Sequence, residues 1–409
     1  MPTRRTALVL DGSGAQSVVA VRVLGALGCA VLTETGTRSA RSRWTTGLVE
    51  LPRPDAEPDG YLERLRRICA DRGVHLVVPS TDLTLFLCWR AAREDDTIAG
   101  ARVLSADRWS AEIFLDKLAG VRTAQASGFG VPETRAGNTA AAVVAACVEL
   151  GFPCVVKPRR SFQLVGGRLR QLRHVIVIER AAAESAVRAL TGDDGLLPIV
   201  QEYVEGRALA VTAVVHHRGV VAHSARETLS FYPLGGGTSV WKRTVPPDTE
   251  GVSEALAFLA ASGLDGIAEL EYKLSSAGPR FMEVGPRLHG WIPLAEVSAP
   301  GLLEAAVRAA FDELVTPIPS YRPNVEMRWI GGELRRLAAL VRGPLLPGTS
   351  RMDVLRAAWP PWRPAMRYDA IDFSDPGPWL PAPFARFSVA RRPAVARIAE
   401  NDAPRTNRQ

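Results

Sequence analysis

The stretch RFMEVGPRLHGW, residues 280–291, places a carboxylate and a guanidinium four residues apart around a Gly-Pro turn. An earlier apolar run, AELEYKL, carries Glu271. If the two runs pair as an antiparallel hairpin through the turn SSAG, Glu271 and Glu283 can project from one face, because side chains alternate with a period of two. Two such carboxylates repel each other unless a cation lies between them. The arrangement predicts a magnesium site, with Arg287 placed to bind a phosphoryl oxygen. An exposed hairpin with unrelated charges is the alternative.

Lysine usage points to the same chemistry. Only four of the 50 basic residues are lysines, at positions 117, 157, 242 and 273. A lysine kept in a chain that otherwise uses arginine suggests a position that needs a compact ammonium. Lys117 lies on a predicted helix, and Lys157 ends a predicted strand, CVVKP. Lysines, magnesium and an arginine are sufficient for ATP activation, since phosphoryl transfer needs mainly positioning and charge neutralisation.

The first third of the chain must supply a scaffold, and it alternates strand and helix patterns. The expected strands are TALVLDG, CAVLTET and VHLVVPSTD, and the expected helices are AQSVVAVRVLGALG and YLERLRRICADRG. Repeated βαβ units predict a parallel doubly wound sheet. The turn GSGAQS, followed by Glu34, imitates a dinucleotide-binding fingerprint but lacks its third glycine, so we predict a tight turn. A nicotinamide-dependent enzyme is kept as an alternative.

From about residue 110 the pattern changes. One helix, SAEIFLDKLAGVRTAQ, is expected to carry Lys117, and SFQLVGGRLRQLRHVIVIE is expected to form a hairpin that turns at Gly166 and Gly167. The last part, from Thr316, holds 14 of the 30 prolines and four of the nine tryptophans. Proline at this density allows helices only in GGELRRLAALVRG and SRMDVLRAAW. We predict a segment that wraps over the main body, with a disordered tail from about residue 398.

Composition excludes several classes of protein. No stretch offers the ~20 uncharged apolar residues of a membrane span, and Asp11 interrupts the first apolar run, so we expect neither a membrane anchor nor a secretory signal. Five scattered cysteines fit a reducing cytoplasm and give no zinc motif. The net charge of +7 arises after Thr316, where 15 arginines face 8 acids. Without a patch interleaved with aromatic residues, we expect no nucleic-acid partner.

Six segments together resemble the ATP-grasp superfamily, in particular its carboxylate–amine ligases. In chain order they are LDKLAG, FPCVVKP, VQEYVEG, GGGTSVWKR, AELEYK and FMEVGPRLHGW. The resemblance covers roughly residues 6–314 and implies an α/β plus α+β fold. Its parts would be a Rossmann-like pre-ATP-grasp domain (1–108), a lid and first nucleotide-binding half (109–204), a lobe with the metal site (205–315) and a C-terminal extension (316–409). Homodimers are common among members.

The resemblance also implies roles for individual residues. Glu271 and Glu283 would bind Mg²⁺. ATP would be bound by Lys117, Lys157, Gln201, Glu202, Val204 and Glu205. Arg287, Lys242 and Arg243 would act in catalysis, the last two within a loop, residues 235–243, that closes over an acyl phosphate. Substrate contacts would come from Arg226, Gly236, Gly237, His289 and Trp291.

The activity that the resemblance implies is an ATP-dependent ligase that joins a small carboxylic acid, or an amino acid, to an amine in specialised metabolism. The sequence departs from the family where Gly285 replaces a metal-binding asparagine, where Ala208 replaces a ribose-binding acid, and where RRSFQLVGGRL lacks a dense glycine run. These departures keep open a catalytically degenerate ATP-binding protein, or a ligase that acts on a carrier-bound acyl group. A biotin-dependent carboxylase is disfavoured because no biotin-carrier lysine motif is present.

Overall fold

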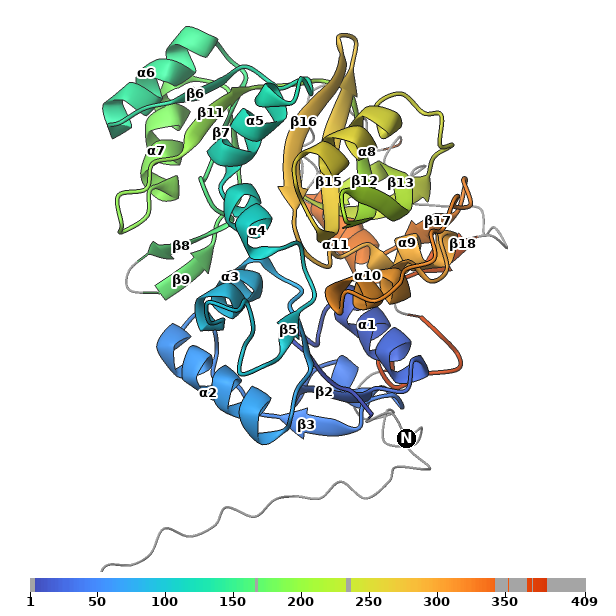
Figure 1. Cartoon of the computed structure of the whole chain (residues 1–409). Coiled ribbons are helices and arrows are strands. Elements are labelled where there is room, and N and C mark those ends of the chain that lie inside the picture. The colour runs from blue at the N-terminus through green and yellow to red at the C-terminus, as the bar shows by residue number, and fades with distance from the viewer. Residues whose placement is uncertain are drawn as a thin grey trace, which may run out of the picture.

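Three lobes make up the protein, as the computed structural model shows (Figure 1). It describes residues 4–165, 168–232, 237–342, 352, 366–369 and 371–380. Gly236, the turn Gly166-Gly167, the tail from about residue 398 and, apart from Met352, the predicted helix SRMDVLRAAW lie outside the described residues.

The N-terminal lobe is the parallel doubly wound sheet that the sequence predicts. Its strand order is β3-β2-β1-β4-β5, with every neighbouring pair parallel. The apolar runs form strands because both faces of the sheet are covered by helices. The strands are β1 (Thr6–Val9), β2 (Ala30–Glu34), β3 (Gly47–Val49), β4 (Leu76–Val78) and β5 (Arg102–Val103), and the helices are α1 (Ala15–Ala26), α2 (Pro58–Asp71) and α3 (Asp82–Ala91). A short 3₁₀ turn, η1 (Ser39–Arg41), follows β2.

The turn after β1 is held by a hydrogen bond within the N-terminal lobe. The backbone N–H of Gly12 donates to Oε2 of Glu34 at 2.9 Å, so the acid that imitated a ribose ligand is used inside the lobe. The tight-turn interpretation of GSGAQS therefore agrees with the structure.

The predicted single helix around Lys117 is two helices, α4 (Arg108–Leu115) and α5 (Lys117–Ala126). Asp116 between them is extended (φ −98°, ψ 110°), and its carboxylate accepts hydrogen bonds from the backbone of Leu118 and Ala119. An aspartate at this position satisfies the free N–H groups of a helix start better than it continues a helix. The expectation of one helix was wrong, and Lys117 is instead the first residue of α5.

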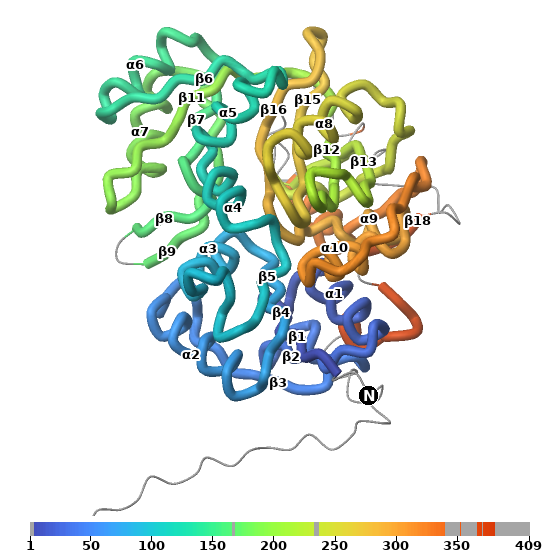
Figure 2. Tube along the Cα trace, in the orientation of Figure 1, coloured from blue at the N-terminus to red at the C-terminus, as the bar shows by residue number. Residues whose placement is uncertain are grey.

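The second lobe is a four-stranded antiparallel sheet covered by two helices. Its strand order is β10-β7-β11-β6. The elements are β6 (Thr134–Ala136), β7 (Cys154–Lys157), β10 (Val175–Val177), β11 (Ile199–Glu202), α6 (Ala140–Leu150) and α7 (Arg180–Leu190). The expected hairpin forms from β8 (Phe162–Val165) and β9 (Arg168–Gln171) and leans on the N-terminal lobe (Figure 2). There the rings of Phe162 and Phe86 lie 4.9 Å apart, and the Leu169 N–H donates to the Asp55 carbonyl.

The third lobe contains a seven-stranded sheet of order β16-β15-β12-β13-β14-β17-β18. Its strands are β12 (Arg207–His216), β13 (Gly219–Tyr232), β14 (Thr238–Thr244), β15 (Gly266–Ser275), β16 (Gly278–Gly285), β17 (Glu326–Arg328) and β18 (Met366–Tyr368). The accompanying helices are α8 (Val252–Ala261), α9 (Ile292–Ser298), α10 (Leu302–Ala310) and α11 (Ile330–Arg342).

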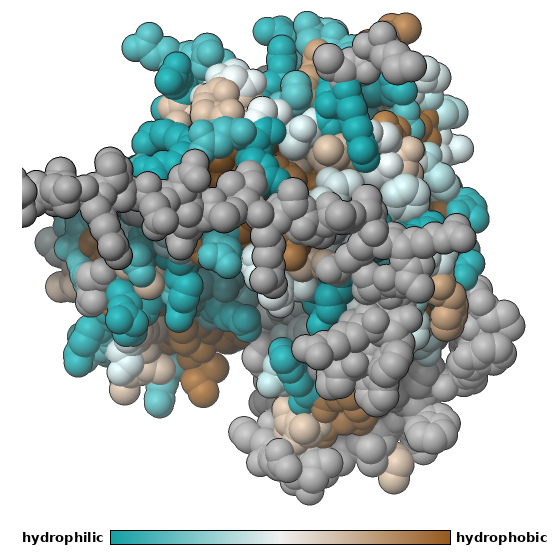
Figure 3. All heavy atoms as spheres, turned by 90° about the horizontal axis from the view of Figure 1, so that it is seen from below, coloured by the Kyte–Doolittle hydropathy of each residue, from teal (hydrophilic) through white to brown (hydrophobic). Residues whose placement is uncertain are grey.

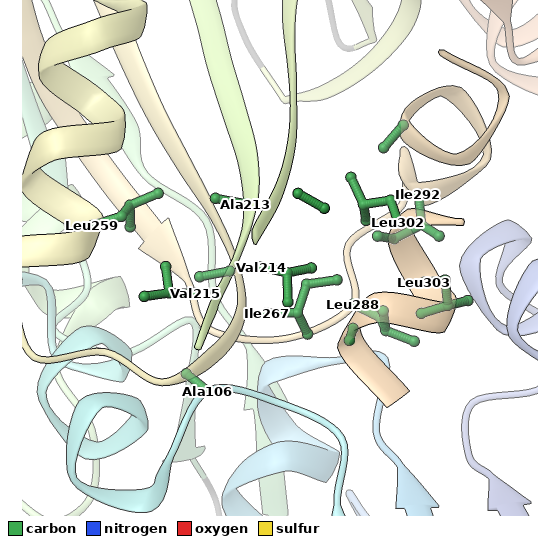
Figure 4. Packing of buried hydrophobic residues seen from close by; sticks show 14 of the residues in the cluster. Ala106, Ala213, Val214, Val215, Leu259, Ile267, Leu288, Ile292, Leu302 and Leu303 are labelled. Atoms are coloured by element: carbon green, nitrogen blue, oxygen red, sulfur yellow. The ribbon is translucent and has the colours of Figure 1, made fainter. Parts of the chain in front are cut away.

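The two faces of this sheet differ in chemistry because side chains alternate along each strand. On one face Val211, Ala213 and Leu270 are fully buried in a core with Leu259 of α8 and Leu302 of α10, part of which Figure 4 shows. The opposite face of the same strands carries polar and charged side chains. That face forms the candidate site.

The C-terminal extension wraps over the body as predicted, as far as it is described. β18 pairs parallel with β17, and the chain then reaches the N-terminal lobe. There Asp375, 1% exposed, accepts hydrogen bonds from Arg22 Nε at 2.9 Å, Ser42 Oγ at 2.7 Å and the Arg43 backbone at 2.9 Å. On the side seen in Figure 3, hydrophilic side chains predominate among the described residues. No helix in the described part of the chain is both long and apolar enough to cross a membrane.

Candidate functional site

The hairpin β15–β16 brings two carboxylates face to face. Glu271 lies directly opposite Glu283 in the antiparallel register, as the sequence pattern predicts. Their side chains are 43% and 45% exposed, so both can reach a ligand. Desolvation and the negative charges of Glu269 and Glu283 raise the pKa of Glu271. Two half-exposed carboxylates on one face present oxygen ligands of the kind that a hard divalent cation such as Mg²⁺ prefers.

A buried arginine organises the adjacent strands. Arg226 on β13 is 4% exposed; its Nε donates to Glu269 Oε1 at 2.8 Å, and its Nη2 donates to Glu271 Oε1 at 3.2 Å. Its Nη1 donates to Thr228 Oγ1 at 3.1 Å. Although burial opposes it, the positive charges of Arg226, His289 and Lys242 lower the pKa of Glu269 to about 2. Arg226 is therefore an internal counter-ion for two glutamates, rather than a surface pair with its neighbour in sequence.

Lys242 on β14 is a buried ammonium without an anion. It is 1% exposed, and its Nζ lies 4.1 Å from the centre of the Trp291 ring. Among the described residues it forms no hydrogen bond or ion pair. Burial and the charge of Arg226 lower its pKa well below the usual value, against the opposing charges of Glu269 and Glu271. A charge held in this way is stabilised by an anionic ligand.

Arg243 lies on the other face of β14. Its Nη2 is 3.5 Å from Oε2 of Glu227, a carboxylate that also accepts two hydrogen bonds from Arg207 at 2.7 and 2.9 Å. Because adjacent side chains of a strand point to opposite faces, Lys242 and Arg243 cannot both face the site. The catalytic role expected for Arg243 therefore has no support in its position. Gly237 is described at the start of β14 with φ 147°, in a conformation that favours glycine.

His289 supports the site from within. It is 5% exposed; its Nε2 lies 2.8 Å from Thr212 Oγ1, and its Nδ1 lies 3.3 Å from Glu269 Oε2. Burial lowers its pKa to about 3, so the imidazole is neutral at physiological pH. The structure places His289 beside Glu269 and Trp291 beside Lys242, and both side chains are buried.

The N-terminal lobe contributes the carboxylate of Asp82 to the site. Asp82, the first residue of α3, is 2.6 Å from both Nε and Nη2 of Arg287. Lys117 donates to Ser161 Oγ at 2.9 Å and lies 3.5 Å from Glu283 Oε2. Although burial opposes it, the charges of Arg287 and Lys117 lower the pKa of Asp82. Arg287 and Lys117 thus lie near Glu271 and Glu283, and the positive charges of both act on Asp82 of the N-terminal lobe.

The second lobe contributes Lys157 and the segment after β11. Burial lowers the pKa of Lys157 to about 8, helped by the charges of Lys117 and Lys273 and opposed by those of Glu283 and Glu271. Lys273 Nζ donates to the carbonyl of Val204 at 2.6 Å. Gln201, 2% exposed, donates its amide to Thr134 Oγ1 at 2.9 Å. The Gln201 side chain and the Val204 carbonyl are thus already engaged, whereas Glu202 is half-buried and Glu205 is exposed.

Most of the residues chosen from the sequence lie in this one cluster. The structure adds four partners that sequence reasoning missed, namely Asp82, Ser161, Thr212 and Glu269, and gives Lys273, noted only for its scarcity, a defined position beside Val204. Glu269 and Lys273 share a strand face with Glu271 at a spacing of two, which was a usable signal. Asp82 and Ser161 come from other lobes, and no local pattern marks them.

If Lys157 binds phosphate, as the resemblance implies, its pKa predicts a pH dependence for nucleotide binding. Below about pH 8 the side chain is an ammonium that attracts phosphate, and above it the neutral amine does not. The Kd for ATP is therefore expected to rise by up to about tenfold per pH unit above pH 8. Lys157→Arg should remove this rise, since arginine stays charged. Calorimetric titration between pH 7 and 9 measures both; a wild-type Kd that stays constant over this range contradicts the assignment.

Comparison with solved structures identifies the fold. The chain matches the biotin carboxylase domain of the 2-oxoglutarate carboxylase of Hydrogenobacter thermophilus, which was solved as a dimer with MgADP, ADP and bicarbonate. The TM-score is 0.61, and the sequences are 15% identical. The match covers 78% of this chain and 73% of that one. It also matches the L-amino acid ligase of Bacillus licheniformis, with a TM-score of 0.59 and 16% identity over 77% and 76%. No family model matches the sequence, and comparison with curated proteins finds no significant match. The protein has the ATP-grasp fold.

Proposed function

We propose that the protein is an ATP-dependent ligase that joins a carboxylate to an amine through an acyl phosphate. The observation that carries this proposal is the pair Glu271 and Glu283, opposed on neighbouring strands with Lys117 3.5 Å from the second carboxylate. The fold supports it, because one match is an amino acid ligase and another was solved with MgADP.

The roles follow from charge and position. Lys117 and Lys157 bind ATP phosphates, and Arg287 binds the phosphoryl group in transfer. Mg²⁺ would be held by Glu271 and Glu283 and would neutralise charge on the phosphates. Lys242, a buried lysine that forms no ion pair within the described part of the chain, binds the substrate carboxylate. The carboxylate oxygen takes the γ-phosphoryl group and ADP leaves; the amine then attacks the acyl carbon, giving an amide, phosphate and a proton.

The proposal is tested by ADP release with Mg-ATP against a panel of amino acids, dipeptides and small carboxylic acids, with mass detection of products. Bicarbonate with biotin belongs in the panel, because four of the matched structures are biotin carboxylases or their domains or subunits. ADP release that depends on an acid–amine pair and yields its amide is the expected result. Release only with bicarbonate and biotin would overturn the ligase assignment in favour of carboxylation. ATP binding without any ADP release would favour a non-catalytic protein.

Gly285 offers a sharp test of the metal assignment. Its φ lies outside the left-handed region, and a Cβ added there would meet only the Glu269 carbonyl, at 3.9 Å. An asparagine therefore fits and can offer the oxygen ligand that the resemblance predicts at this position. We expect Gly285→Asn to lower the Mg²⁺ concentration for half-maximal activity by about tenfold, in line with one added ligand. Gly285→Ala, which adds the Cβ without the oxygen, is the matched control; equal Mg²⁺ dependence of the two variants would contradict the assignment.

A further inference from the structure

Two arginines and a glutamate are buried where strand β17 meets helix α11. Arg328, the last residue of β17, is 2% exposed. Glu333 and Arg336, both on α11, are each 8% exposed. The packing at the start of the helix is tight, because a Cβ added at Gly332 would collide with the Trp329 ring. The three charges are therefore held away from solvent, where an ionised group needs a partner.

These side chains compensate one another only in part. Nη1 of Arg328 lies 3.6 Å from Oε1 of Glu333, and Nη1 of Arg336 lies 3.5 Å from Oε2 of the same carboxylate. Both separations exceed the ~2.7–2.9 Å of a charge-assisted hydrogen bond. Within the described residues, no group accepts a hydrogen bond from Nε or Nη2 of Arg328 or from Nε or Nη1 of Arg336. Two positive charges thus share one negative charge, and their N–H groups lack acceptors.

An aromatic ring and a hydroxyl lie beside the three charges. Cζ of Arg328 is 3.7 Å from the centre of the Trp241 ring, which belongs to the neighbouring strand β14. Ser230 Oγ on β13 donates to Oε1 of Glu333 at 3.4 Å. Burial lowers the pKa of Arg328, against the opposing charge of Glu333. Stacking on the ring fixes the plane of the guanidinium but gives its N–H groups no acceptor.

We propose that Arg328 and Arg336 bind a small monocarboxylate anion. A carboxylate offers two oxygen atoms in one plane, which is the geometry that the N–H groups of a guanidinium match. Its single negative charge balances the net positive charge of the two arginines and Glu333. A phosphate dianion would leave an uncompensated buried negative charge, which is costly. The planar side of a carboxylate with an apolar group also suits the Trp241 ring.

This site is separate from the residues proposed to bind ATP and its substrates. Arg328 lies opposite Trp241 in the strand register, whereas Lys242 lies opposite Met327. Because adjacent side chains of a strand point to opposite faces, Arg328 and Lys242 face different sides of the sheet. Through Ser230 and Trp241 the site reaches both β13 and β14. A bound carboxylate would join these strands to β17 and α11 and stabilise this part of the third lobe.

The test measures the unfolding temperature of the full-length protein without ATP, by scanning calorimetry in acetate, propionate or benzoate against chloride at equal ionic strength. A saturating carboxylate should raise this temperature by about 2 °C or more, and phosphate should act as chloride does. Arg328→Met and Arg336→Met should each weaken the apparent affinity by about tenfold or more, because each removes charge-assisted hydrogen bonds. Arg335→Met, which changes the adjacent, exposed arginine of α11, is the matched control and should respond as the wild type does.

Glu333→Gln provides a prediction of opposite sign, which still tests the proposal if an arginine variant fails to fold. Loss of the competing negative charge should strengthen carboxylate binding by about tenfold. Lys242 is itself proposed to bind a substrate carboxylate, so the measurement is repeated in Lys242→Met, where the response should remain. No response in the wild type, or equal responses in the wild type, Arg328→Met and Arg336→Met, would overturn the proposal. A response that is lost only in Lys242→Met, or one that phosphate matches, would overturn it as well.

Discussion

Replacing Glu283 with glutamine is expected to lower the rate of ADP formation by about 10³-fold or more. The substitution keeps the shape of the side chain but removes one of the two charges that face each other across β15 and β16. Metal-assisted charge neutralisation contributes several kcal/mol to a transferring phosphoryl group, and ~4 kcal/mol corresponds to about three powers of ten in rate. The measurement is steady-state ADP release with the most active substrate pair of the panel.

The control for this prediction is Glu254→Gln, which changes an exposed glutamate on α8. It should leave the rate unchanged. Thermal unfolding of Glu283→Gln should stay close to that of the wild type, because Glu283 is 45% exposed and, within the described residues, is ion-paired with Lys117 alone. Turnover within tenfold of the wild type would show that Glu283 is not a metal ligand.

Arg226→Met is expected to lower the free energy of unfolding by about 3 kcal/mol or more. The arginine is 4% exposed and is bound to the buried carboxylate of Glu269, so its loss leaves that charge with weaker partners. Urea denaturation followed by circular dichroism measures the change. Arg243→Met, which removes a 40% exposed arginine from the neighbouring strand β14, is the matched control and should cost less than about 1 kcal/mol.

Acid denaturation gives a second readout of the same interaction. The pKa of Glu269 is about 2 in the folded protein, below its ordinary value of 4.5. The stabilisation is therefore present in full above pH 4.5 and is lost as the pH falls toward 2, by about 3 kcal/mol in all. In Arg226→Met the pKa depression should shrink, so stability should depend less on pH in this range. An unchanged acid profile would contradict the assignment of Arg226 as the counter-ion.

Much of the fold could be predicted because periodicity determines it locally. The run TALVLDG is continuously apolar, which predicts a strand of a parallel sheet that is covered on both faces. The short turn SSAG sets the register of β15 and β16, and with it the opposition of Glu271 and Glu283. The break at Asp116 was missed because the apolar period continues on both sides, while the capping hydrogen bonds of the carboxylate outweigh helix continuation.

The site was predictable where its residues share a strand and hidden where they come from different lobes. All four lysines belong to one electrostatic cluster with Glu271, as their scarcity suggested. Asp82 lies 205 residues from Arg287 in sequence, and tertiary contacts such as the bridge between Ser105 and Arg287 bring the two parts of the chain together. Arg243 was predicted to act together with Lys242 because the two are adjacent in sequence. Adjacent side chains of a strand point to opposite faces, so the two residues lie on different sides of β14.

The buried carboxylate of Asp375 limits which parts of the protein can move. The N-terminal lobe is tied to the third lobe and its extension at several separate places, among them Asp375 with Arg22, Asp82 with Arg287 and Arg5 with Glu313. Several separated contacts leave these bodies little relative rotation. The second lobe, which contains β7 and β11, is joined to the other two lobes by its connecting segments and by the contact between Phe162 and Phe86. It is the lobe that we expect to move most. If the protein binds ATP as proposed, nucleotide exchange is expected to move this small lobe relative to the other two.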